Sequence, residues 1–203
     1  MWPTRIDIIG QNGNEGLHYK GLEMNLKSHV MLDLETLGTR AGCGIIAIGA
    51  CTLDCSDTFY QKILPSSASE AGLFEDPDTM KWWAKQSPAA REESFSGTTP
   101  LISVLGSFAD WLLQVKRSTN TMSEISVWGN GADFDQPILS AAYHAVKMKQ
   151  PWKPYNGRCY RTLKNLKPQV AAPVFEGEKH TALADALHQA RHAQLLLASL
   201  QVL

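Results

Sequence analysis

The chain has 203 residues, of which 44% are apolar and 19% are charged, and its formal net charge is −1. This length fits one domain with a sizeable core, and the composition is that of a globular protein rather than a disordered tract. No apolar run approaches the roughly 18 residues that span a bilayer, and the first residues lack the basic and apolar segments of a secretory signal. We therefore expect a cytoplasmic protein with reduced cysteines and no membrane partner.

The first 28 residues show no steady periodicity and precede a strong strand signal at His29. We expect residues 1–28 to be an extension and residues 29–203 to form a single domain. Met24 lies just before the first strand and is a candidate for the biological start.

Three consecutive strands are predicted next, over residues 30–36, 45–53 and 58–64. The first strand alternates, so that Asp33 and Glu35 project from one face and apolar side chains from the other. The second is a continuous β-branched and apolar run, which is typical of a central buried strand. The third is expected to be its antiparallel neighbour, so the three strands make a meander.

Helical patterns follow the meander. Asp76-Pro77 and Ser87-Pro88 each combine a cap residue with a proline at the first helical position. The resulting order, β-β-β-α-α-α-β-α-α, fits an α/β fold in which helices flank a mixed sheet. A loop is expected around Asn156 and Gly157. The predicted helices cover residues 77–86, 88–94, 100–116, 135–149 and 182–200, and the fourth strand covers residues 124–128.

Acidic residues stand out in three separate segments: Asp33-Leu34-Glu35 on a predicted strand, Asp135 at a helix start, and Asp185 at another. Each has an ordinary explanation when taken alone, namely an exposed strand face, a helix cap by Asp133 or Asp135, and a favourable position in the helix dipole. The strand pair, however, is embedded in apolar neighbours. Two buried acids are costly unless a cation neutralises them.

Together, these acids and a His-x4-Asp segment are the groups that a dinuclear magnesium site requires, because hard cations prefer oxygen ligands. The pattern resembles the DEDDh 3′-5′ exonucleases of the ribonuclease H-like superfamily, which includes polymerase proofreading domains, oligoribonuclease and ribonuclease T. The resemblance covers about residues 29–200 and rests on three motifs in family order. They are Asp33-Leu34-Glu35-Thr36, Asn130 with Phe134-Asp135, and His180 to Asp185.

The resemblance implies a ribonuclease H-like mixed sheet, in which an antiparallel three-strand meander is extended by parallel strands. It also implies an enzyme that uses two divalent ions, Mg²⁺ or Mn²⁺, to release nucleoside 5′-monophosphates from single-stranded RNA or DNA with a free 3′ end. Asp33 would bridge both ions, Glu35 and Asp185 would complete the site that activates water, and Asp135 would hold the second ion. His180 would be the general base.

Substrate contacts are implied in the same way. The backbone around Thr36 and Leu37 would meet the terminal sugar, and Phe134 would support the site or pack near the terminal nucleotides, with Asn130 in the same motif. The chain departs from many family members in its first motif, because Thr36 is followed by Leu37-Gly38 rather than by a second small polar residue and glycine.

Two further features concern nucleic acid. Trp82 or Trp83 could stack on bases, but adjacent helix positions point about 100° apart, so at least one is expected in the core. Arg161 belongs to residues 147–179, a stretch that contains eight basic residues and only two glutamates. This stretch fits either a solvated face or a track for the phosphate backbone. The tryptophan pair and residues 156–163 resemble a phage and prophage exoribonuclease-like subgroup.

Three other patterns give weaker evidence of a cofactor or metal site. Gly42-Cys43-Gly44 matches a loose dinucleotide-binding fingerprint, but it opens a β-branched run instead of a helix. Cys51 and Cys55 lack a second pair of ligands for zinc. His188 and His192 have the i, i+4 spacing of a metal pair, although a solvent-facing stripe is the more common outcome for such a pair.

Two rival functions remain beside the exonuclease. One is a nucleic-acid-binding or protein-interaction module that has lost catalysis, which would lack an acid or the base, and none is missing. The other is an endonuclease of the ribonuclease H type, against which the His180-to-Asp185 motif argues. The leucine- and alanine-rich final helix fits a homodimer face, and core packing explains it equally well.

Overall fold

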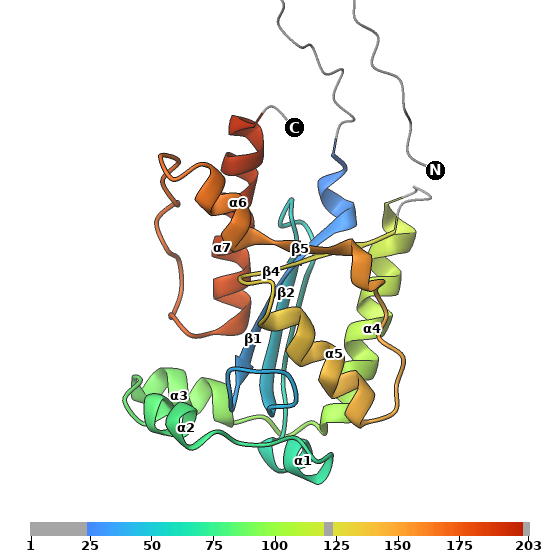
Figure 1. Ribbon diagram of the computed structural model, residues 1–203, viewed down its shortest axis with the longest axis vertical. Coiled ribbons are helices and arrows are strands. Elements are labelled where there is room, and N and C mark those ends of the chain that lie inside the picture. Colours follow the sequence, from blue (N-terminus) through green and yellow to red (C-terminus); the bar gives the residue numbers. More distant parts are fainter. Residues whose placement is uncertain (1–23, 120–123, 201–203) are drawn as a thin grey trace, which may run out of the picture.

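The computed structural model describes residues 24–119 and 124–200. Its centre is a five-stranded sheet with the order β3-β2-β1-β4-β5 (Figure 1). The first three strands are antiparallel, whereas β4 pairs in parallel with both β1 and β5. The predicted meander extended by parallel strands is thus confirmed. The strands are β1 (His29–Thr36), β2 (Ile45–Thr52), β3 (Thr58–Lys62), β4 (Ser126–Gly129) and β5 (Gly157–Cys159).

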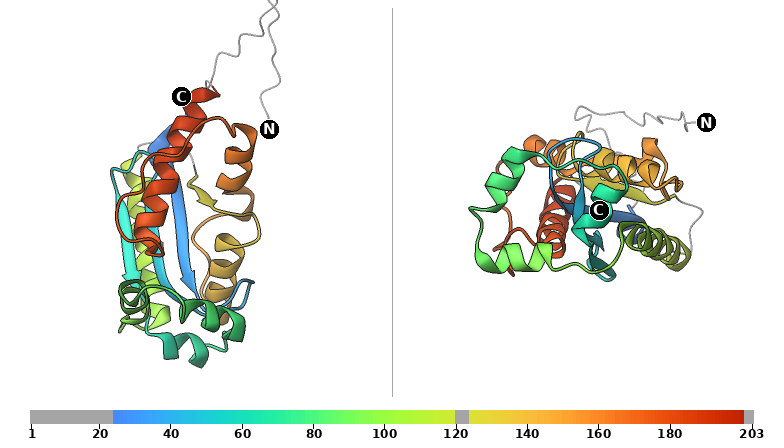
Figure 2. Two further views of the ribbon diagram at one scale, coloured as in Figure 1. Left: turned by 90° about the vertical axis from the view of Figure 1, so that its left-hand side faces the viewer. Right: turned by 90° about the horizontal axis from the view of Figure 1, so that it is seen from below.

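Helices cover both faces of this sheet (Figures 1 and 2). Helices α4 and α5 share a core with one face, α6 and α7 share a core with the other, and α1 to α3 gather at the end of the sheet where β1 finishes. The helices are α1 (Pro65–Glu70), α2 (Pro77–Trp83), α3 (Pro88–Phe95), α4 (Leu101–Ser118), α5 (Asp135–Ala145), α6 (Tyr160–Leu166) and α7 (Ala182–Ser199), with 3-10 turns η1 (Leu26–Ser28) and η2 (Pro154–Asn156).

The alternation of β1 divides its side chains between these two cores. The even-numbered apolar residues from Val30 to Leu34 lie under α4 and α5, and Met31 lies under α7. Because strand side chains alternate, Asp33 and Glu35 lie on the same face as Met31. The two acids therefore point to the side of the sheet that α7 covers.

Helix α7 comes unusually close to the centre of the sheet at Gly49. This glycine pairs with Asp33 across β2 and β1. An ideal Cβ built on it would lie 2.1 Å from the carbonyl carbon of Ala182 and 2.3 Å from the amide nitrogen of Leu183. The first turn of α7 therefore rests on bare β2 backbone, which brings the start of this helix over Asp33.

Strand β5 and helix α6 replace the loop that the sequence predicted around Asn156 and Gly157. The strand is only three residues long, and the helix follows it with Cys159 as its cap, the thiol sulfur accepting from the amide of Thr162 at 3.4 Å. Cysteine is not a residue that signals a helix start. Pairing with β4 and packing against α7, rather than local sequence, stabilise these elements.

Helix α1 was also not predicted, and α5 is shorter than expected. The six-residue α1 depends on a distant contact, in which Ser67 Oγ accepts from the amide of Leu101 at 2.9 Å. Helix α5 ends at Ala145 instead of residue 149, because Lys147 adopts a left-handed backbone with φ of 58°. Other element boundaries agree with the predicted ones to within three residues.

The apolar face of α7 is occupied by its own chain. Alanines and leucines from Ala186 to Leu197 are buried in the core shared with Met31. His192 is also buried, so the solvent-facing stripe expected for it is wrong: its Nδ1 lies 2.7 Å from the hydroxyl of Tyr160, and its Nε2 lies 2.9 Å from the carbonyl of Val170.

Residues 1–23, the larger part of the expected extension, lie outside the described residues. Met24 and Leu26 pack against the core beneath α7. Between residues 24 and 119 and between 124 and 200, no helix has the length and hydropathy needed to cross a bilayer.

The contact at Gly49 predicts a large effect of a single methyl group. Gly49→Ala should lower the free energy of unfolding by ~3 kcal/mol, since backbone atoms of α7 would have to move to make room. Gly106→Ala is the matched control, because Gly106 lies inside α4 with no atom near its ideal Cβ. That change should raise the free energy of unfolding by ~1 kcal/mol. Urea denaturation of both variants measures the difference, and equal midpoints would contradict the close approach.

Candidate active site

Three carboxylates from two elements meet under α7. Asp33 and Glu35 come from β1 and Asp185 from the first turn of α7, and one carboxylate oxygen of each lies within 4.8 Å of the others. Within the described part of the chain, this is the one group of three or more acids, histidines or cysteines arranged to share an ion. The alternation of β1 and the approach of α7 over Gly49 together produce it.

Asp135, the first residue of α5, completes the acidic set. Its side chain is buried, and its Oδ2 accepts a hydrogen bond from the amide of Asn130 at 2.8 Å. An ideal Cβ at Gly129 would lie 2.8 Å from the same oxygen, so glycine is needed at the end of β4. Neither acid proposed as the cap of α5 has that role, because the cap position is Phe134. The charge of Asp135 reaches Asp33 and raises its pKa.

Burial sets the electrostatics of this cluster. It raises the pKa of Glu35 to about 8 and that of Asp135 to about 7, and it also raises the pKa of Asp185. Burial and the charges of the other three acids raise the pKa of Asp33 well above its usual range. A neutral donor opposes this shift, since Gln189 Nε2 donates to Asp33 Oδ1 at 2.7 Å. The protein thus compensates the four negative charges only in part.

His180 lies beside the acids, two residues before α7. Its backbone is left-handed, with φ of 62°, and its amide donates to Asp185 Oδ2 at 2.9 Å. Its ring stands at 87° to the ring of Trp82, with 5.0 Å between the centroids. The histidine is therefore tied to one of the carboxylates through its backbone while its ring faces a neighbouring helix.

These residues line an open cavity of about 720 Å³. Asp33, Glu35 and Asp185 are among its lining residues, and the start of α2 contributes Asp76 and Asp78. The other predicted site residues that line the cavity are Thr36, Asn130, Phe134, His180, Trp82 and Trp83.

Three predicted residues lie just outside the cavity lining. The carboxylate of Asp135 is buried behind it. Leu37 is buried, with its amide donating to the carbonyl of Gly44 at 2.8 Å and its carbonyl accepting from the amide of Asp76 at 2.7 Å. Arg161 is exposed near the rim, and its Nη2 donates to the carbonyl of Asn130 at 2.7 Å.

The two tryptophans have different environments. Trp83 is 2% exposed, packs edge-on against Phe95, and donates from Nε1 to the carbonyl of Thr36 at 2.8 Å. Trp82 is 42% exposed and stands between Trp83 and His180. Trp83 therefore joins α2 to the end of β1, and Trp82 leaves a large aromatic surface open to the cavity.

Sequence reasoning missed two residues that support the site. Gln189 lies one helical turn after Asp185, and this i, i+4 spacing was a signal that both share one face of α7. Ser94 is buried in α3, and its hydroxyl donates to the carbonyl of His180 at 3.4 Å. No sequence signal links Ser94 to His180, because the two residues are 86 positions apart.

Comparisons with known proteins identify the family of this chain and the known fold that it resembles. Residues 28–197 match the family described as the 3′-5′ exoribonuclease Rv2179c-like domain. The chain matches no curated protein sequence. Its fold is similar to the crystallographic structure of the nuclease domain of 3′hExo, a DEDDh family member, bound to rAMP. The TM-score is 0.55 at 15% identity, and the match covers 84% of this chain and 91% of that chain. The chain therefore belongs to the 3′-5′ exoribonuclease Rv2179c-like domain family, and it is a hydrolytic 3′-5′ exonuclease.

Proposed function

We propose that this exonuclease removes nucleotides from the 3′ end of single-stranded RNA, with two divalent ions, Mg²⁺ or Mn²⁺, and with His180 as general base. The convergence of buried and half-buried carboxylates from β1, α5 and α7 beside a histidine in an open cavity carries this proposal. The description of the matching family as an exoribonuclease supports RNA as the substrate.

The acidic cluster fits such ions. Hard divalent cations prefer carboxylate oxygens, and their charge offsets the burial and the repulsion that raise the pKa of Asp33. Asp33, Glu35 and Asp185 would hold one ion, and Asp33 with Asp135 would hold the other. When bound, such ions supply the positive charge that eases deprotonation of an attacking water and stabilises the leaving oxygen.

His180 would take the proton from the attacking water. As the water oxygen bonds to phosphorus, the bond from phosphorus to the 3′ oxygen of the preceding nucleotide breaks, and that oxygen takes a proton from solvent. The products are a nucleoside 5′-monophosphate and a strand with a new 3′ hydroxyl. The hydrogen bond from the His180 amide to Asp185 links the position of the base to that of an ion ligand.

The surroundings of the acids suggest how the strand lies. The exposed ring of Trp82 offers a stacking surface to the terminal base, and Phe134 lines the cavity near it. Arg161 at the rim offers a cation to the backbone phosphates. Asp76 lines the cavity at the start of α2 and would repel phosphates, whereas Asp78 is paired with Lys81 at 2.8 Å; the strand would therefore run past Arg161 on α6.

A labelled-strand assay tests the reaction. With Mg²⁺ or Mn²⁺, single-stranded RNA labelled at its 5′ end should be shortened stepwise, and a chelator should abolish this. Asp33→Asn should reduce the rate by at least about 10²-fold because an ion ligand is lost. Asp110→Asn, an exposed site on α4, is the matched control. Internal cuts would indicate an endonuclease, and full activity of Asp33→Asn would contradict the assigned site.

The raised pKa values predict how the stability of the metal-free protein depends on pH. An acid whose pKa is higher in the folded state stabilises that state when protonated, so this stability is lost as pH rises. In chelator, Tm should fall from about pH 5 to about pH 9, through the pKa of Glu35 at about 8. Mg²⁺ should reverse the fall, and Asp33→Asn should raise Tm at the alkaline end. A flat profile in calorimetry would contradict the electrostatic description.

The position of Arg161 predicts a binding effect without a chemical one. Arg161→Ala should raise KM and leave kcat nearly unchanged, because the guanidinium contacts the strand away from the bond that breaks. The slope of log affinity against log salt should become shallower by roughly 0.7, the value for one phosphate contact on a single strand. Arg117→Ala, an exposed arginine on α4, is the control. An unchanged salt slope for Arg161→Ala would remove this residue from the binding surface.

A further inference from the structure

His180 lies outside any helix or strand, so regular secondary structure does not fix the position of its ring. It belongs to the connection that leads into α7, and its backbone is left-handed, a conformation that non-glycine residues adopt only when the surroundings impose it. A general base on such a segment needs external contacts to keep its ring at a fixed distance from the reacting water. The structure contains these contacts on α2 and α3.

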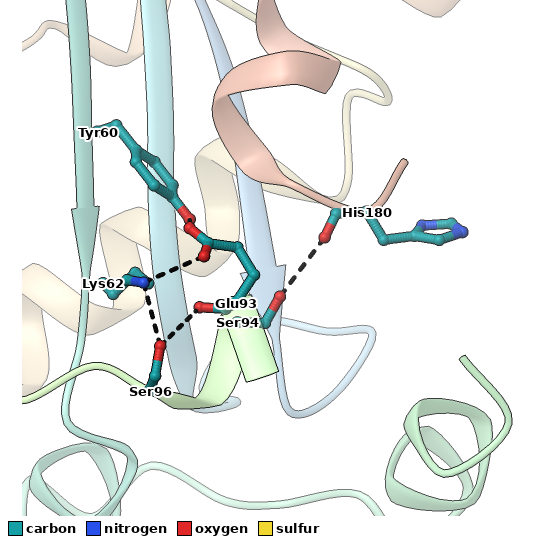
Figure 3. A network of polar contacts seen from close by, with 6 residues as sticks. All are labelled: Tyr60, Lys62, Glu93, Ser94, Ser96 and His180. Atoms are coloured by element: carbon teal, nitrogen blue, oxygen red, sulfur yellow. Dashed lines mark hydrogen bonds and ion pairs between the residues drawn. The ribbon is translucent and has the colours of Figure 1, made fainter. Parts of the chain in front are cut away.

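Helices α2 and α3 contact the connection at three points. The Ser94 hydroxyl donates to the His180 carbonyl at 3.4 Å, and the Trp82 ring packs against the His180 ring. The Ser87 hydroxyl, at the start of α3, donates to Glu178 Oε1 at 3.0 Å. Figure 3 shows the His180 carbonyl directed toward Ser94 while its ring extends to the opposite side.

Helix α3 is in turn fixed to the sheet. The Tyr60 hydroxyl of β3 donates to Glu93 Oε1 at 2.8 Å, and Lys62 Nζ donates to Glu93 Oε2 at 3.2 Å and to Ser96 Oγ at 3.0 Å (Figure 3). Glu93 and Ser94 are consecutive, so one turn of α3 holds the sheet with one residue and the His180 carbonyl with the next.

Helix α2 is fixed to the same sheet at another place. Trp83 Nε1 donates to the carbonyl of Thr36, the residue that follows Glu35 at the end of β1. Trp82, next to Trp83, contacts the His180 ring. Helices α2 and α3 thus each connect His180 to the sheet that carries Asp33 and Glu35.

We propose that α2 and α3 form a clasp that sets the position of the His180 ring, with Ser94 and Trp82 as positioning residues. The proposal rests on the function proposed above for His180. Ser94 is buried and does not line the cavity, so it acts on the reaction only through the histidine. Trp82 lines the cavity and can also meet substrate, which makes Ser94 the cleaner residue to change.

A double-mutant cycle tests the clasp. Ser94→Ala should lower kcat about tenfold with KM unchanged, because misplacing a catalytic group slows the chemical step. His180→Ala should lower kcat by roughly 10² to 10⁴-fold, and adding Ser94→Ala to it should cause no further loss. Ser140→Ala is the matched control, because Ser140 is also a helical serine, on α5, and its hydroxyl donates to Gln150 at 2.6 Å and not to His180. It should leave kcat unchanged.

Nuclear magnetic resonance of the metal-free protein gives a readout independent of activity. The chain has six histidines, so the His180 ring signal is identified by its loss in His180→Ala. The nearby Trp82 ring should move the chemical shift of this signal away from that of a free histidine. Ser94→Ala and Trp82→Leu should both move it back, and Ser140→Ala should not.

The outcomes separate the clasp from the proposed function. Wild-type kcat and an unmoved ring signal in Ser94→Ala would overturn the clasp and leave the exonuclease reaction intact. An equal loss of kcat in the wild-type and His180→Ala backgrounds would also overturn it, because Ser94 would then act by another route. Absence of chelator-sensitive activity in the wild type would overturn the proposed function, whereas the ring signal would still report whether the clasp exists.

Discussion

The dominant constraint on this fold is the cost of holding several carboxylates together away from water. Folding removes Asp33, Glu35 and Asp135 from bulk solvent, and the neighbouring charges add to this cost at Asp33 and Glu35. Such a cluster does not stabilise the metal-free chain. The two apolar cores on either side of the sheet must therefore supply the stability that keeps the acids in place.

Missing side chains allow the acids to converge. At Gly49, the absence of a Cβ lets the first turn of α7 sit directly on β2, and at Gly129 it makes room for the carboxylate of Asp135. In both cases a helix begins where a strand offers only backbone. At Gly49 main chain rests on main chain, and at Gly129 the short Asp135 side chain rests on main chain; such contacts are less able to shift than contacts between long side chains.

The sequence predicted the features that have local signals. Alternation over residues 30–36 placed Asp33 and Glu35 on one face, and Asp76-Pro77 and Ser87-Pro88 marked two helix starts correctly, with both side chains accepting a hydrogen bond as caps. The meander followed from three successive strand patterns. These predictions succeeded because short-range periodicity and capping chemistry decide them.

Features that depend on distant partners could not be predicted in this way. Strand β5 exists because β4 offers an edge to pair with, and the short helix α1 exists because Ser67 meets the start of α4. His192 has the spacing of an exposed stripe but is buried by Tyr160 and by the carbonyl of Val170. The contact between Ser94 and His180 is of the same kind, since only the folded chain brings α3 to the connection before α7.

The cavity has charges of both signs around it, with Asp76 and Asp78 at the start of α2, the latter paired with Lys81 at 2.8 Å, and with Arg161 hydrogen-bonded to the lining residue Asn130. In the proposed reaction, a phosphodiester with one negative charge becomes a 5′-monophosphate with nearly two at neutral pH. Asp76, at the start of α2, would therefore disfavour the product more than the strand from which it came. The same charge would thus hasten departure of the freed nucleotide and clear the way for the next cycle.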